Sequence, residues 1–282
     1  MQRILIPVDF SDYATKAALF AAEIAALNQS TLYYLHAMEL GIERIYQPLT
    51  DDNRYLTIAE ERQSALEEFR DGIKKVYPNI KTELLLESGT AVDSILETCR
   101  MQQIDLVVMG TRGAGKIKQV LVGSTAAGVV AGSAIPVLVV PSGYAIEKPD
   151  GILFATNHFE EDEGVLSMII TLARLFSATI HAVVFVDTDK AEAYDYLENT
   201  RKMDHYKNWL NKKYPDISFH CELAEGEHFE NAIELYQVRH DTDMVAMITY
   251  PRGFWQKLLQ KSATRKMIFH SAIPILAIPA RK

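Results

Sequence analysis

The amino-acid sequence predicts an α/β protein made of two tandem domains, residues 1–143 and 144–282, each an open sheet of five parallel strands. Three observations lead to this fold class. The chain repeats itself, short apolar segments alternate with helix-length segments, and the apolar segments are nearly continuous, as in strands buried on both faces. Strands separated by helix-length segments form right-handed βαβ crossovers, which give a parallel sheet covered by helices.

The internal repeat consists of four blocks that recur in the same order. The first two blocks recur at a spacing of 148 residues and the last two at a spacing of 138. The first copy therefore carries about ten extra residues, which we place around 41–62. The matching blocks are 4–6 with 152–154, 31–32 with 179–180, 105–109 with 243–247, and 133–141 with 271–279.

The elements of the first copy follow from local patterns. Ser11 can cap a helix that carries alanines at helical spacing, and a charged amphipathic helix must end before Pro78. Runs of apolar and β-branched residues predict the strands. The predicted strands are 3–8, 31–38, 81–87, 105–109 and 136–140. The first predicted helix begins after Ser11, the second covers 58–77, the third includes 92–99 and the fourth covers 125–132.

Composition excludes several classes of protein. The net charge of −8 is spread evenly, with 13 basic and 17 acidic residues up to residue 143 and 16 and 20 after it, so nucleic acid is not an expected partner. Asp9 and Asp12 lie where the apolar part of a signal peptide would run, and no apolar stretch reaches the roughly 20 residues of a membrane span. Two cysteines fit a reducing compartment. We expect a soluble cytoplasmic protein.

A glycine-rich segment follows the fourth predicted strand. Gly110 and Gly113 lie where the chain leaves that strand, and glycine there allows positive φ and close approach of backbone N–H groups to a ligand. Gly123, Ser124 and Thr125 then open a helix, whose free N–H groups suit an anion. The spacing fits neither a Walker loop nor a dinucleotide-binding turn. Two facing groups of amides could hold a polyphosphate.

These residues carry a resemblance. The spacing G-x2-G-x9-G-S in residues 110–124 resembles the nucleotide-binding motif of the ATP-binding universal stress proteins, and the segments 7–11 (PVDFS) and 35–39 (LHAME) are similar to the same family. The resemblance covers both copies. It implies Rossmann-like domains, of the adenine nucleotide alpha hydrolase type, that bind ATP where the strand order reverses. It also implies that segments 136–140 and 274–278 pair antiparallel, which makes the chain an intramolecular pseudo-dimer; a homodimer is possible as well.

The resemblance implies a role for each site residue. Asp9 would face the adenine or ribose beside Pro7 and Val8, the backbone of Ala37 would bind the adenine edge, and Met109 would pack near the nucleoside. Mg²⁺ or Mn²⁺ could bridge the phosphates, without a dedicated acidic cage. Purely structural interpretations stay open. The glycines could serve only the turn, and Asp9 could cap the first helix. Arg112 and Lys116 could be solvated cations rather than phosphate ligands. The phosphates would be held by Gly110, Gly113, Gly123, Ser124 and Thr125, helped by Arg112.

The second copy departs from this motif. Gly110, Gly113 and Gly123 become Ile248, Pro251 and Lys261, Asp9 becomes Asn157, and Ser262 alone persists, so we expect no ATP there. Seven of the eight histidines lie in this half. Their spacing fits no standard zinc pattern, and His220 and Cys221 would point to opposite faces of a strand, so no metal site is predicted.

The sequence favours a nucleotide-responsive stress regulator over an enzyme. No acid–base pair and no activated nucleophile accompany the glycine-rich segment, and Cys99 lies on the apolar face of a helix. A slow ATPase or a nucleotidyl-transferring enzyme on the same fold is the alternative. A third interpretation is an interaction protein whose nucleotide site is idle.

Overall fold

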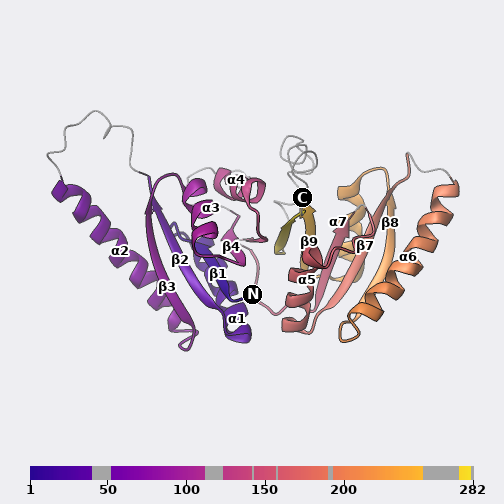
Figure 1. Ribbon diagram of the computed structural model, residues 1–282, viewed down its shortest axis with the longest axis horizontal. Helices are drawn as coiled ribbons and strands as arrows, with labels where there is room; N and C mark the ends of the chain where they lie inside the picture. The colour runs from indigo at the N-terminus through magenta and orange to yellow at the C-terminus, as the bar shows by residue number, and fades with distance from the viewer. Residues whose placement is uncertain are drawn as a thin grey trace. The chain divides into compact units, whose positions relative to one another are not determined.

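The computed structural model describes residues 1–39, 52–111, 123–141, 143–156, 158–189, 193–249 and 273–280. The chain divides into two compact units, Met1–Ile146 and Glu147–Lys282. Each unit combines parallel strands with helices that pack on the sheet (Figure 1). The predicted α/β class with parallel sheets is confirmed.

The first unit has the strand order β3-β2-β1-β4-β5, and all neighbouring strands in it run parallel. Because the chain adds β2 and β3 on one side of β1 and β4 and β5 on the other, the strand order reverses between β1 and β4. Ligands of such sheets bind at this point, beyond the carboxyl ends of the strands. The strands are β1 (Arg3–Pro7), β2 (Thr31–Met38), β3 (Lys81–Ser88), β4 (Leu106–Gly110) and β5 (Val137–Val140).

The helices of this unit contact each other in two pairs, α1 with α2 and α3 with α4, as expected for a doubly wound sheet. The alanine stripe of α1 is buried, so its backbone lies close to β1 and β4. The second helix begins at Asp52 rather than at residue 58, because its first turn is polar and lacks the apolar period used to predict it. The helices are α1 (Asp12–Asn28), α2 (Asp52–Lys74), α3 (Ala91–Met101) and α4 (Ser124–Gly132).

The second unit repeats this topology, with the order β10-β9-β6-β7-β8. Its neighbouring strands are again parallel. The internal sequence repeat therefore corresponds to a structural repeat. The elements are β6 (Gly151–Thr156), α5 (Glu163–Phe176), β7 (Thr179–Asp187), α6 (Ala193–Lys213), β8 (Phe219–Gly226), α7 (Phe229–His240), β9 (Met244–Thr249) and β10 (Ile275–Pro279).

Both cysteines are free thiols. Cys99 lies in the core, as predicted, and burial raises the pKa of its thiol to about 12. Burial also raises the pKa of Cys221, to about 11. Both thiols are therefore protonated near neutral pH, which argues against a nucleophilic role. Within the described residues, no helix is both long and apolar enough to cross a membrane.

Candidate functional site

A cavity of about 120 Å³ opens where the strand order of the first unit reverses. The carboxyl ends of β1, β2 and β4 form its floor, and the first turns of α1, α3 and α4 contribute walls. It is mostly apolar, and Asp9 is the carboxylate among its described lining residues. The lining consists of Pro7, Val8, Asp9, Ala14, Leu35, His36, Ala37, Ala91, Ile95, Met109, Gly110, Thr111, Gly123, Thr125 and Ala126.

A tight turn between β1 and α1 places Asp9 in the cavity wall. Oδ1 of Asp9 accepts hydrogen bonds from the Ser11 hydroxyl at 2.6 Å and the Ser11 N–H at 3.1 Å. The Ser11 hydroxyl oxygen in turn accepts from the N–H of Ala14, which caps α1. Phe10 between them has φ of 62°, an uncommon conformation for a bulky residue. The Asp9 carboxylate thus holds the N-cap residue Ser11 in place and also lines the cavity.

His36 connects β2 to the end of β1, a role that the sequence did not predict. Its Nδ1 lies 2.7 Å from the carbonyl oxygen of Val8, so Nδ1 carries the proton and donates. The imidazole also packs on the ring of Phe10, with the ring centroids 4.6 Å apart. These contacts fix the turn that carries Asp9.

The backbone of Ala37 faces the cavity. The carbonyl oxygen of Leu35 accepts from the N–H of Val8 at 2.7 Å, so Leu35 directs its backbone groups toward β1. Backbone groups alternate sides along a strand, and β1 ends at Pro7, opposite Leu35. Ala37 therefore directs its N–H and C=O toward the β1 side of β2, at a point beyond the end of β1. A donor and an acceptor so placed can bind the edge of a planar heterocycle.

Gly110 is required by packing rather than by its φ angle. Gly89 is the one glycine of the described chain with positive φ, so the freedom to adopt positive φ does not explain the glycine at position 110. A Cβ at position 110 would lie 2.8 Å from Cβ of Tyr13 and 2.9 Å from its backbone C and O atoms. Real Cβ atoms do not approach backbone this closely, so glycine lets β4 and α1 meet.

We predict that Gly110→Ala lowers the free energy of unfolding by about 1–3 kcal/mol, because a backbone clash cannot relax by a rotamer change. Gly72→Ala is the matched control. Gly72 is exposed within α2, and nothing lies within 4 Å of a Cβ there, so alanine should stabilise by about 0.5–1 kcal/mol. Urea denaturation without nucleotide measures both changes. Equal effects of the two substitutions would contradict the packing role.

The start of α4 offers three backbone donors, but Gly123 is not among them. The N–H of Gly123 donates to the carbonyl oxygen of Thr111 at 2.9 Å, so the expectation that this amide holds phosphate is wrong. Gly123 is instead the N-cap residue, with φ of −58°. The N–H groups of the next three residues have no acceptor within the helix, as at any helix start. These donors belong to Ser124, Thr125 and Ala126.

The structure brings eight of the eleven predicted site residues to one cavity. Ser124 is exposed and does not line it, and Arg112 and Gly113 lie outside the described residues. Sequence reasoning missed Thr111 and the walls formed by Ala91 and Ile95. The predicted topology could have indicated these walls, because the third helix must begin beside the same strand ends. The eight are Pro7, Val8, Asp9, Ala37, Met109, Gly110, Gly123 and Thr125.

The second unit differs at the corresponding place. Ile248, at the position of Gly110, is buried with 5% of its surface exposed. At the spacing of 148, Tyr13 corresponds to Glu161. Tyr13 lies inside α1, whereas Glu161 precedes the first residue of α5. The helix of the second unit therefore starts later, where Ile248 has a larger side chain than Gly110. Asn157, Pro251, Lys261 and Ser262 lie outside the described residues.

Fold and cavity together define a doubly wound α/β protein with a site at the reversal point of its first sheet. The universal stress protein family model matches residues 1–141, so the chain belongs to that family. It is 30% identical to a universal stress protein of Methanocaldococcus jannaschii, and the match covers 49% of this chain and 81% of that protein. It is also 30% identical to a universal stress protein of Thermus aquaticus, with 49% of this chain and 96% of that protein covered. A universal stress protein of Archaeoglobus fulgidus shares the fold over 98% of this chain and 96% of its own, with a TM-score of 0.73 and 18% identity.

Proposed function

We propose that the first unit binds ATP in this cavity and that the protein acts as a nucleotide-responsive stress regulator. One observation carries the proposal: residues from four separate chain segments, predicted as nucleotide contacts, line a single cavity at the point where such sheets bind ligands. Membership of the universal stress protein family supports it.

The adenine would occupy the apolar part of the cavity. Met109, Ala91 and Ile95 offer apolar surface there, and the backbone of Ala37 offers a donor and an acceptor to the edge of the base. The cavity is smaller than the roughly 300–1,000 Å³ of pockets that enclose drug-sized ligands, so it suits one end of an elongated molecule. Asp9, beside the base, would face the ribose.

The phosphates would extend toward the start of α4. The N–H groups there and the positive end of the helix dipole favour an anion, and Ser124 and Thr125 add hydroxyl groups. Arg112, Gly113 and Lys116 belong to the connection between β4 and α4, so they could complete this site. Mg²⁺ or Mn²⁺ would arrive with the phosphates, because Oδ1 of Asp9 already accepts two hydrogen bonds from Ser11.

Identification of the bound nucleotide tests this proposal. We expect mass spectrometry of the purified protein to detect ATP, and calorimetric titration of nucleotide-free protein with Mg-ATP to show one site per chain. GTP should bind more weakly, because its base edge reverses the donor and acceptor that Ala37 would meet. Absence of ATP affinity in the full chain would refute the proposal. The cytoplasmic location stays a prediction, based on the sequence.

A further inference from the structure

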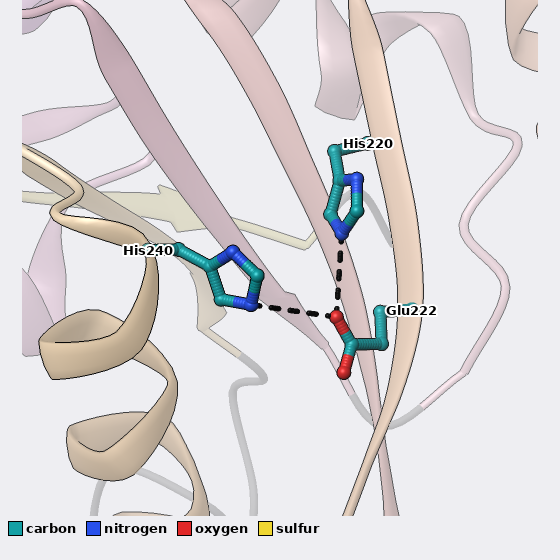
Figure 2. A group of neighbouring side chains, drawn as sticks. All are labelled: His220, Glu222 and His240. Atoms are coloured by element: carbon teal, nitrogen blue, oxygen red, sulfur yellow. Dashed lines mark hydrogen bonds and ion pairs between the residues drawn. The ribbon is translucent and has the colours of Figure 1, made fainter.

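Three polar side chains converge on one face of the second unit, far in sequence from the motif of the first. His220 and Glu222 are two residues apart on β8 and therefore project from the same face of that strand. His240 is the last residue of α7, and Figure 2 shows its ring and that of His220 both directed toward the Glu222 carboxylate. Two elements thus deliver two imidazoles to one carboxylate.

The spacing of these groups matches that of ligands around a small cation. Oε2 of Glu222 lies 3.3 Å from Nε2 of His220 and 3.6 Å from Nε2 of His240, and all three ligand atoms lie within 4.8 Å of one another. Donor atoms about 2.0–2.2 Å from a tetrahedral zinc ion are about 3.3–3.6 Å apart. An ion could therefore contact all three with small side-chain adjustments.

One ring nitrogen lacks the interaction that burial normally demands. Nε2 of His240 is buried and has no hydrogen-bond partner among the described residues. Its distance of 3.6 Å to Glu222 is too long for a hydrogen bond. Leaving a buried polar atom unsatisfied destabilises the folded state. A cation between His240 and Glu222 would satisfy this nitrogen and neutralise the carboxylate.

The neighbouring aromatic side chains hold these imidazoles in place. Tyr236, one turn earlier on α7, stacks on His240 with the ring centroids 4.2 Å apart. Its hydroxyl group lies 3.1 Å from Nδ1 of His181, which is opposite His220 on β7. The ring of His181 also packs beside both of these imidazoles, with its centroid 5.4 Å from that of His220 and 5.7 Å from that of His240.

We propose that His220, Glu222 and His240 bind a divalent first-row transition-metal ion, with Zn²⁺ the best fit. Two nitrogen ligands and one oxygen ligand suit Zn²⁺, whereas Mg²⁺ and Ca²⁺ prefer oxygen ligands throughout. The His220 side chain is 49% exposed and that of Glu222 35%, so an ion can enter from solvent and a water molecule can complete a tetrahedral set. This proposal does not depend on ATP binding by the first unit.

The proposal revises the metal prediction from sequence. Cys221 alternates with His220 and Glu222 along β8, so it faces the other side of the sheet, as expected. The third ligand comes instead from α7, 18 residues after Glu222. The resulting spacing, His-x-Glu-x17-His, is not a standard zinc pattern, and for that reason sequence reasoning missed it.

Competition with a chromophoric chelator tests the site on the full chain, without a histidine tag and stripped of metal. We expect one Zn²⁺ per chain, and a Co²⁺ complex with visible absorption typical of tetrahedral coordination. His240→Gln and Glu222→Gln should each weaken Zn²⁺ binding at least tenfold. His205→Gln is the matched control, because His205 is an exposed histidine on α6 and should leave affinity unchanged.

Circular dichroism of each variant separates loss of a metal ligand from loss of the fold. If His240→Gln does not fold, Glu222→Gln alone tests the contribution of the ligands to Zn²⁺ binding. Two results would overturn the proposal. One is Zn²⁺ affinity that is the same in the wild type, His240→Gln and Glu222→Gln. The other is no Zn²⁺ binding by the wild type, in which case the three side chains contact one another without a metal ion.

Discussion

Thr125→Glu is expected to remove ATP binding from the full-length protein while leaving it folded. Thr125 is the second residue of α4 and lines the cavity where the phosphates would lie. A carboxylate there would repel the triphosphate by about 1–4 kcal/mol, which corresponds to roughly a 10- to 1,000-fold loss of affinity. The same charge interacts favourably with the helix dipole, so stability should stay level or rise by about 0.3–1 kcal/mol. Mg-ATP titration and thermal unfolding measure the two effects.

Ala131→Glu provides the matched control for charge. Ala131 is exposed in the last turn of the same helix and does not line the cavity. The new carboxylate there should leave ATP affinity unchanged and cost about 0.3–1 kcal/mol of stability, because the helix dipole is reversed at this end. The assignment of the phosphate site fails if Thr125→Glu binds ATP as well as Ala131→Glu does.

Much of the fold could be predicted because the information is local or repeated. Buried strands such as β4 consist of apolar residues whose burial follows from composition alone. The repeat of residues 133–141 at 271–279 required two similar domains. The start of α2 at Asp52 was missed, because its polar first turn carries no apolar period.

The site was predicted less completely, because backbone hydrogen bonds and side-chain contacts between distant segments do not appear in a motif. Gly110 suggested close approach of a ligand, whereas its lack of a side chain is required by Tyr13. Gly123 suggested an amide for phosphate, whereas that amide already donates to Thr111. Both glycines belong to the family motif, so the motif combines residues for ligand binding with residues for packing.

The metal cluster shows the same limit in the second unit. His240 lies near Glu222 because α7 ends beside β8. Neither the length of α7 nor its last residue can be predicted from the periodicity of apolar residues. Helix ends are the least certain feature of a prediction from sequence. A ligand set that depends on a helix end therefore becomes visible only in three dimensions.

The protein is expected to bind one ATP per chain, so Thr125→Glu should leave no site of wild-type affinity. The argument rests on the second unit. Ile248 replaces Gly110 at the end of β9, and its buried, branched side chain fills space beside the strand ends. Pro251 removes a backbone donor, and Asn157 lacks the charge of Asp9.

A calorimetric titration of wild type and Thr125→Glu with Mg-ATP at matched protein concentrations decides between one site and two. A residual site of wild-type affinity in Thr125→Glu would place ATP in the second unit, and the importance given to the glycine positions would then be wrong in both halves. Ile248→Gly is a further control. This substitution restores only one of the four altered positions, so it should lower stability by leaving a cavity and should not add an ATP site.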